Sequence, residues 1–375
     1  MGEGDRRAAG GPATQRRNAA SVGGGAGGGG RAPASGRQPI ADGAQLGRRL
    51  AARDLTVAPA VLNLLESTAP GDRAQAAALL REVSPAALAG EGGGLAGEAP
   101  GHVVGVTGPP GAGKSTLLSA LLRGWRERGA TVAMLAVDPS SRRSGGSLLG
   151  DRARIEFDPA DRGVFIRSTA AGERLGGIAR GTRAAAQALA AAFDVVVIET
   201  VGVGQAETEV GDIADTVVVV VQPGSGDVLQ FLKSGIMEIP DLLVVTKADL
   251  GQVALSARRD LTAAARSLGT RSTRVLAVSS LSPPTGIEDL LDALAEHRAQ
   301  LSAEGGAKLA ARRLRARRAG ALLDFAVEHG ERGLRAVGGR RAAERWLASL
   351  DPALDEAALA AALERRMSRD GTDGP

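Results

Sequence analysis

Short apolar runs alternate with amphipathic stretches through the middle of the chain. The amphipathic stretches carry apolar residues at helical spacing. Runs that are apolar at consecutive positions and separated by helices are typical of a parallel sheet covered on both faces. The pattern therefore predicts an α/β fold with a mostly parallel sheet over residues 101–303. The expected strands are Val103–Val106, Val132–Val137, Val164–Ile166, Val195–Ile198, Thr216–Val221, Leu242–Val245 and Val275–Val278, and the expected helices include Thr116–Arg128, Leu175–Ala192, Val228–Met237, Ala254–Leu268 and Ile287–Leu301.

Both ends of the chain depart from this central pattern. Residues 1–43 carry hardly any large apolar side chain, so we expect a disordered tail that buries too little surface to offset its ordering entropy. Residues 44–100 predict an N-terminal helical segment with a glycine-rich linker. Residues 304–368 predict a C-terminal helical extension, followed by a disordered tail at 369–375. Within the extension, we expect Asp351-Pro352 to start the last helix as an N-cap followed by proline.

Composition excludes several classes of site. The chain has no cysteine and three histidines far apart in sequence, which argues against a disulfide framework, a thiolate metal site or a histidine-rich metal site. The net charge is only +4, so the sequence pI near 10.2 reflects missing titratable groups rather than a basic surface. We therefore expect no nucleic-acid partner. Because no apolar run approaches a membrane span, and Glu3 and Asp5 do not fit a leader peptide, we expect a cytoplasmic protein without a membrane partner.

Arginine supplies most of the positive charge. Only four of the 46 cationic side chains are lysines, and two of these, Lys114 and Lys247, fall in the motifs described below. One arginine cluster stands out in the C-terminal extension. We expect it to form a solvated helix face, with an acidic docking patch as the alternative. Its members are Arg312, Arg313, Arg315, Arg317 and Arg318.

A phosphate-binding motif follows the first expected strand. Gly108 to Ser115 fit the pattern G-x-x-x-x-G-K-[ST], and the motif opens a helix, which is the context it requires. Its glycines allow backbone N–H groups to surround an anion at the positive end of the helix dipole. We expect Lys114 to contact the phosphate oxygens of the nucleotide and Ser115 to ligate Mg²⁺. The expected phosphate-binding residues are Gly108, Pro109, Pro110, Gly111, Ala112, Gly113, Lys114, Ser115 and Thr116.

Acidic residues at other strand ends are expected at the same edge of the sheet. Asp138 follows the second strand and Glu199 the fourth. Ligands of parallel sheets bind at the carboxyl ends of the strands. A carboxylate there either holds Mg²⁺ or orients the attacking water, and Gly202 is placed to offer its N–H to the γ-phosphate. Asp151, in a glycine-rich loop typical of a switch segment, is a further candidate ligand.

A base-recognition motif follows the sixth strand. Thr246-Lys247-Ala248-Asp249 places a carboxylate that accepts hydrogen bonds from N1–H and the N2 amine of guanine. Adenine has an acceptor at N1, so the same carboxylate disfavours ATP. The segment Ser279-Ser280-Leu281, at the end of the last strand, is expected to support the base from the other side.

With these motifs placed, the chain resembles the MeaB/ArgK family of P-loop GTPases, chaperones of adenosylcobalamin-dependent acyl-CoA mutases such as methylmalonyl-CoA mutase. The resemblance covers about residues 50–301, and the family's usual base motif has Asn where this chain has Thr246. It is densest in Gly108–Thr116, Asp138–Arg152, Glu199–Gly211, Pro223–Met237 and Thr246–Asp249.

The resemblance implies a G domain of the SIMIBI type that hydrolyses GTP with Mg²⁺. It implies that Lys114, Glu199 and Asp151 act in catalysis, and that Gln205–Glu209 lie in the second switch. The metal ligands would be Ser115, Asp138, Asp151 and Glu199. GTP binding and hydrolysis would gate cobalamin delivery to a mutase and protect or reactivate it, and the C-terminal extension would form a homodimer.

Two other functions share this scaffold. A metallochaperone GTPase for nickel enzymes needs Cys and His ligands, and this chain lacks cysteine. The family is also labelled as an ATPase or kinase linked to arginine and ornithine transport, although no amino-acid site is evident in the sequence.

Overall fold

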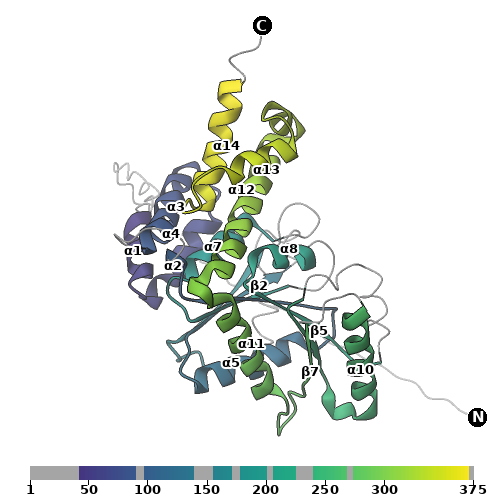
Figure 1. The fold of residues 1–375 in the computed structure, drawn as a ribbon. Coiled ribbons are helices and arrows are strands. Elements are labelled where there is room, and N and C mark those ends of the chain that lie inside the picture. Colours follow the sequence, from purple (N-terminus) through teal and green to yellow (C-terminus); the bar gives the residue numbers. More distant parts are fainter. Residues whose placement is uncertain are drawn as a thin grey trace, which may run out of the picture. The chain divides into compact units, whose positions relative to one another are not determined.

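A computed structural model of the chain describes residues 42–89, 97–138, 155–170, 178–200, 206–224, 240–267 and 273–370. Its centre is a seven-stranded parallel sheet in the order β3-β2-β4-β1-β5-β6-β7 (Figure 1). The seven expected strands are confirmed, each within a few residues of its predicted ends. The strands are β1 (His102–Thr107), β2 (Val132–Asp138), β3 (Val164–Ala170), β4 (Val195–Glu199), β5 (Thr216–Val221), β6 (Leu242–Val245) and β7 (Arg274–Ala277).

Consecutive strand residues point to opposite faces of the sheet, so each apolar strand contributes to two cores. Val104 and Val106 of β1 pack with helices α5 (Lys114–Glu127) and α11 (Ile287–Ser302). The opposite core, which includes Val103, lies against helices α7 (Arg180–Leu189), α8 (Ala206–Ile213) and α10 (Gln252–Ser267). Figure 1 shows α5 and α11 on one side of the sheet and α7 and α8 on the other. This two-faced burial explains the uninterrupted apolar runs in the sequence.

Within residues 42–89 the structure has four helices before the sheet: α1 (Gly43–Ala51), α2 (Ala58–Glu66), α3 (Pro70–Glu82) and α4 (Pro85–Leu88), with a short 3₁₀ turn, η1 (Leu55–Val57), after α1. Helices α1 and α3 pack closely, since a Cβ atom at Gly47 would lie 2.7 Å from the carbonyl oxygen of Leu79. Leu62 of α2 belongs to the same core as α7. The N-terminal helices are therefore joined to the sheet through shared apolar packing.

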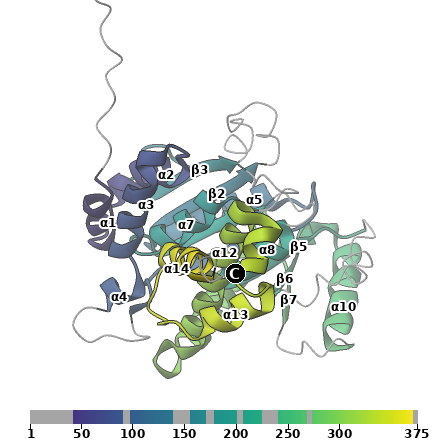
Figure 2. The ribbon, with the colours of Figure 1, turned by 90° about the horizontal axis from the view of Figure 1, so that it is seen from above.

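Three C-terminal helices follow α11 and the short 3₁₀ turn η7 (Glu304–Gly306): α12 (Ala307–Ala336), α13 (Arg340–Ala348) and α14 (Glu356–Asp370). They form an apolar core of their own around Phe325, Leu347 and Leu363. Helix α12 contacts α7 and α8, and Figure 2 shows these helices lying close together when seen from above.

The predicted start of the last helix is wrong. Helix α14 begins at Glu356, and its N-terminal N–H groups are capped by the Asp355 carboxylate, which accepts from the Ala358 N–H at 2.7 Å. Asp351 instead accepts from the Ala353 N–H at 2.9 Å and forms a turn. Asp-Pro is common both in turns and at helix starts, so the dipeptide alone did not distinguish a turn from a helix start.

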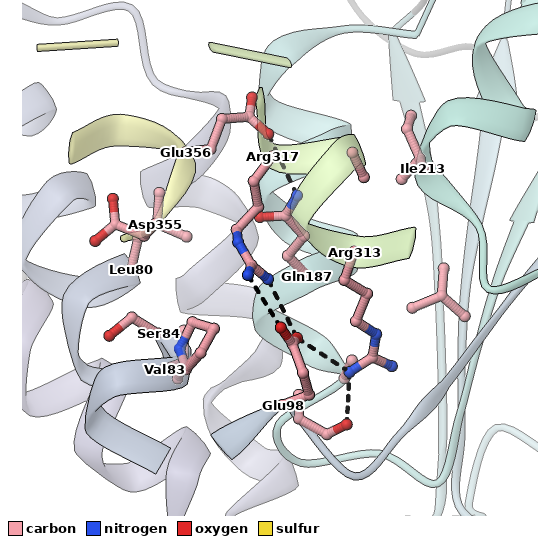
Figure 3. Close-up of a pocket in the computed structure, with 15 residues that line it drawn as sticks. Leu80, Val83, Ser84, Glu98, Gln187, Ile213, Arg313, Arg317, Asp355 and Glu356 are labelled. Carbon is pink, nitrogen blue, oxygen red and sulfur yellow. Dashed lines mark hydrogen bonds and ion pairs between the residues drawn. The ribbon is translucent and has the colours of Figure 1, made fainter. Parts of the chain in front are cut away.

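The expectation of a solvated arginine face on α12 is also wrong for part of the cluster. The Arg313 guanidinium donates to both carboxylate oxygens of Asp215, at 2.9 and 2.6 Å, and to the carbonyl oxygens of Ala99 and Gly101, both at 2.6 Å. Arg317 pairs with Glu98 at 3.0 Å (Figure 3). Arg312 binds Asp241. These arginines anchor α12 to the sheet domain from inside the protein.

Asp215 depends on this anchor. Its carboxylate is fully buried. Burial alone would raise the pKa of Asp215, but the charge of Arg313 and its hydrogen bonds outweigh burial and hold that pKa below its ordinary value. Arg313 therefore keeps a buried charge next to the N–H of Val103, which Asp215 accepts at 2.9 Å.

We expect Arg313→Met to lower the free energy of unfolding by about 3–5 kcal/mol, because the buried Asp215 carboxylate keeps, of its two guanidinium contacts, only the longer one to Arg298, at 3.5 Å. Chemical denaturation monitored by circular dichroism measures this loss. Arg315→Met on the same helix is the control, because Arg315 is exposed, and it should change stability by no more than about 0.5 kcal/mol. Equal effects of the two substitutions would contradict the anchoring role.

Candidate nucleotide site

The phosphate-binding motif forms a tight turn between β1 and α5. Gly108 has φ +145°, and a Cβ atom there would lie 2.0 Å from the carbonyl oxygen of Val220. Gly113 takes a left-handed conformation directly before Lys114, where α5 begins. Helix α5 thus starts at the loop and directs its unsatisfied N–H groups and positive dipole end toward it. The backbone is shaped to receive an anion.

The Lys114 side chain curls back over this loop. Its Nζ donates to the carbonyl oxygens of Gly108 at 2.6 Å and Pro109 at 3.1 Å, and the residue is only 7% exposed. An ammonium group has three N–H donors, and these two carbonyl oxygens fix the direction of two of them. The Lys114 amine therefore lies at the mouth of the loop.

Strand pairing brings Glu199 to the same place. Val106 of β1 lies opposite Glu199 of β4 in the sheet register. The Ser115 hydroxyl, in the first turn of α5, donates to the Glu199 carboxylate at 3.4 Å. The next residue, Thr200, donates through its N–H to Val106 O at 3.0 Å and through its hydroxyl to the Thr107 hydroxyl at 2.9 Å. A hydroxyl and a carboxylate oxygen at this spacing are donors of the type that Mg²⁺ prefers, so this part of the predicted metal set fits the ion.

Other members of the predicted metal and switch set are not brought together by the described residues. Asp138 ends β2 in register with Ala170, and the placement of its side chain is not described. Asp151, Gly202 and Gln205 lie outside the described residues, as does the helix expected at Val228–Met237.

The base motif is tied directly to the phosphate loop. The Thr246 hydroxyl donates to Ala112 O at 2.6 Å and to Val221 O at 3.2 Å, and the residue is 4% exposed. Lys247 takes a left-handed conformation with φ +53°, and its Nζ donates to Gly111 O at 3.3 Å. The first two residues of the motif thus reach back across the strand ends to the loop that opens α5.

Asp249 follows these two residues in the sequence and lies in the short 3₁₀ helix η6 (Ala248–Leu250). Its carboxylate accepts from the Ser279 hydroxyl at 2.7 Å, and the residue is exposed to solvent. The Leu281 N–H donates to the same hydroxyl at 3.3 Å, and the Leu281 side chain is 61% exposed. Ser280 lies between them. The structure therefore brings the two predicted base segments into direct contact and orients the carboxylate.

Three residues of this edge were missed in the sequence. Gln222 accepts from Lys247 Nζ at 2.6 Å, and Thr107 and Thr200 join the ends of β1 and β4. Gln222 directly follows the end of β5, and Thr107 and Thr200 lie at the ends of strands adjacent to the loop. Their positions at strand ends were the available signal, because ligands of parallel sheets bind at the carboxyl ends of the strands.

Two of the three histidines, His102 and His297, lie outside this site. His102 and His297 contact one hydroxyl from two sides, through His102 Nε2 at 2.6 Å and His297 Nδ1 at 2.7 Å from Thr216 Oγ1. Burial lowers the pKa of His102 to about 3. Both lie at the amino ends of the strands, away from the phosphate loop, where they serve the packing of β1, β5 and α11.

Among the described residues, no helix combines the length and apolar character needed to cross a membrane.

The comparisons with known proteins agree with this geometry. A family model described as methylmalonyl-CoA mutase-associated GTPase MeaB matches residues 58–330. A relative from Pyrococcus abyssi, named as a GTPase, is 40% identical over 274 residues, which cover 70% of this chain and 78% of the relative. The mouse protein named methylmalonic aciduria type A homolog, mitochondrial, is 41% identical over 218 residues, which cover 56% of this chain and 52% of that protein.

A solved structure, described as that of an LAO/AO transport system kinase, matches with a TM-score of 0.57 and 26% identity and covers 88% of this chain and 97% of its own. Fold, phosphate loop, base motif and family match all lead to one conclusion: the chain belongs to the MeaB family and is a P-loop GTPase.

Proposed function

We propose that this GTPase is a chaperone that gates adenosylcobalamin loading of an acyl-CoA mutase, such as methylmalonyl-CoA mutase, and protects or reactivates that mutase. The observation that carries the proposal is the family match over residues 58–330, whose description names a mutase-associated GTPase. The mouse relative, named for methylmalonic aciduria, supports the same client class. GTP binding and hydrolysis at the nucleotide site would supply the switch that such a chaperone requires.

Phosphate binding and hydrolysis follow from the loop and the strand ends. Lys114 binds the phosphate oxygens, assisted by the N–H groups at the start of α5. Ser115 and Glu199, joined by Asp138 and Asp151, would hold Mg²⁺, which when bound neutralises phosphate charge. Glu199, whose carboxylate contacts the Ser115 hydroxyl at 3.4 Å, would orient the attacking water.

Guanine recognition is assigned to the base motif, Thr246–Asp249, which is hydrogen-bonded to the phosphate loop. Asp249 accepts from the N1–H and N2 amine of guanine, and Ser279 orients its carboxylate. Thr246 keeps the motif in register with the phosphate loop through Ala112 O. In this arrangement the hydroxyl of Thr246 has a positioning role, and Asp249 carries the discrimination against adenine.

The second switch and the C-terminal helices have further roles in this function. The second switch, Gln205–Glu209, responds to the γ-phosphate, and helices α12–α14 within residues 304–368 provide a homodimer surface. A kinase role in amino-acid transport, suggested by the name of the matching transport system kinase, is the weaker alternative. The guanine-reading arrangement and the GTPase names of the relatives both favour the chaperone.

We expect Thr246→Val to weaken GTP binding about tenfold. Valine keeps the branched shape but leaves Ala112 O and Val221 O without the hydroxyl, which costs roughly 1–3 kcal/mol. Isothermal titration calorimetry measures the Kd. Thr246→Ser keeps the hydroxyl and should retain most of the affinity. A serine variant as weak as the valine variant would show that packing, not the hydrogen bond, matters here.

Asp249→Asn should weaken GTP binding by roughly 10²-fold, because two charge-assisted hydrogen bonds to guanine become poorly matched. The amide can donate to the xanthine carbonyl, so xanthosine triphosphate should bind the variant better than it binds the wild type. Competition with a fluorescent nucleotide measures both affinities. Ser279→Ala, which removes only the orienting hydroxyl, should have a smaller effect. Unchanged GTP affinity in Asp249→Asn would refute the base assignment.

The client is tested by reconstitution with methylmalonyl-CoA mutase. We expect the wild-type chain to restore activity to inactivated mutase when GTP and adenosylcobalamin are present, and the mutase to raise the GTPase rate. Glu199→Gln should bind GTP with near wild-type affinity but neither turn over nor restore the mutase. If the wild type hydrolyses GTP but leaves the mutase inactive and its own rate unchanged, the client assignment is wrong while the GTPase assignment stands.

A further inference from the structure

A cluster of buried charges lies where helices α7, α12 and α14 meet. Arg183 of α7, Asp324 of α12 and Glu356 of α14 have side chains only 6%, 8% and 6% exposed. We call these three residues the Arg183 cluster. Arg183 pairs with Asp324 through Nη2, and its Nε lies 3.5 Å from Glu356 Oε1. One buried guanidinium thus serves two buried carboxylates that come from different C-terminal helices.

The two carboxylates are not equally satisfied. Asp324 also pairs with Arg180 at 3.0 Å, so it has two guanidinium partners. Glu356 receives one hydrogen bond from the Gln187 amide, at 3.3 Å, and its distance to Arg183 is longer than an ordinary charge-assisted hydrogen bond. It is also enclosed sterically, because a Cβ atom at Gly320 would lie 2.4 Å from its carboxyl carbon. Glu356 is therefore the member of the cluster whose ionised form is least stabilised.

Burial and neighbouring charge also disfavour the ionised form of Glu356. Burial, and secondly the charge of Asp324, raise the pKa of Glu356 to about 7, against the opposing charge of Arg183. The other charged groups that face the site are Arg180 from α7, Asp355 at the start of α14, whose pKa burial also raises, and Arg317 of α12 and Glu98 across a small cavity. Asp355 is committed to capping α14.

A small cavity gives Glu356 access to protons. The cavity of about 50 Å³ is lined by Glu356, Asp355, Gln187, Arg317 and Glu98, and Figure 3 shows these polar side chains around it. A buried water needs roughly 10–15 Å³ and a few polar partners, so a cavity of this size and lining suits a short water chain. The carboxyl group can exchange a proton without the helices separating.

The cluster is also connected to the nucleotide side of the molecule. Arg183 Nη1 donates to Ile178 O at 3.0 Å, and the N–H of Ile178 donates to the Glu209 carboxylate at 2.6 Å. Glu209 lies in α8, which is the first described element after the strand that ends at Glu199. The far end of α8 is held as well, since Arg312 of α12 donates to Ala214 O at 2.9 Å. Helix α8 is thus held at two points by residues that depend on the C-terminal helices.

We propose that the Arg183 cluster is a proton-operated latch between the C-terminal helices and α8, closed when Glu356 carries a proton and loosened when it does not. In the closed latch, Arg183 faces one buried negative charge and stays extended toward Ile178. Ionisation of Glu356 adds a second buried negative charge that competes for Arg183 and weakens the support of α8. This goes beyond the proposed client and requires only the GTPase activity of the chain.

The closed latch is stabilised at low pH and weakens as the pH rises. Glu356 binds its proton more tightly in the closed latch than an exposed glutamate does, whose pKa is 4.5. Its stabilising contribution is therefore complete below about pH 4.5 and is lost as the pH rises through about 7. For a midpoint near 7, the equilibrium should shift toward the loosened form by about tenfold between pH 6 and pH 8.

We expect hydrogen exchange of α8 (Ala206–Ile213) and α14 (Glu356–Asp370) in the GTP-bound wild type, corrected for intrinsic exchange, to be up to about tenfold faster at pH 8 than at pH 6. Glu356→Gln, which mimics the protonated carboxyl group, should keep both helices protected at both pH values. Its kcat relative to the wild type should rise between pH 6 and pH 8, by less than about tenfold, with KM unchanged.

The matched control is Glu364→Gln, which removes an exposed carboxylate from the same helix and should follow the wild type. Gly320→Ala serves as a second variant that displaces the Glu356 carboxyl group without changing charge, and its exchange at pH 6 should resemble that of the wild type at pH 8. The proposal is overturned if Glu356→Gln and the wild type keep the same pH dependence. It is overturned equally if α14 responds to pH while α8 and kcat do not.

Discussion

The backbone pairing of β1 with β4 on one side and β5 on the other determines where the chemistry of this protein lies. In this register Val106 faces Glu199, and Thr107 faces Val219. The phosphate loop therefore emerges between the strand that carries the acidic residue and the strand next to the base motif. A slip of one residue would reverse the faces of every strand residue and separate Ser115 from Glu199. The two apolar cores, which require alternate residues on fixed faces, hold this register.

Much of this arrangement could be predicted from the sequence because the determining signals are local. Apolar runs mark buried strands, and the glycines of the phosphate motif occupy left-handed or sterically closed positions that only glycine fills well, as at Gly108 and Gly113. Glu199 and the base motif were expected near that loop because the carboxyl ends of parallel strands lie at the same edge of a sheet. The tie from Thr246 to Ala112 O was not predictable, because a threonine at a strand end has many local partners to choose from.

The arginines of α12 show the limit of such reasoning. Their spacing is the same whether the helix face meets solvent or carboxylates, and the deciding partners lie far away in sequence. Asp215 is 98 residues from Arg313, and Glu98 is 219 residues from Arg317. A guanidinium presents five donors in a rigid plane, so Arg313 satisfies a buried carboxylate and two carbonyl oxygens at once. A chain with few lysines uses arginine for internal attachment as well as for surface charge.

The use of arginine for internal attachment makes the junction of the C-terminal helices sensitive to pH. Their apolar core around Phe325 and Leu363 is separate from the cores on the sheet, so the junction with α7 and α8 relies heavily on ion pairs and hydrogen bonds. An apolar junction is indifferent to protons, whereas a buried ionic one changes strength when a single group gains or loses charge. Arg313 meets Asp215 in a fully satisfied pair and resists such change. Arg183, shared between Asp324 and Glu356, does not. Both kinds of contact therefore coexist at one junction: a permanent anchor at the start of α12, and an adjustable contact further along it, next to the helix that follows the nucleotide site.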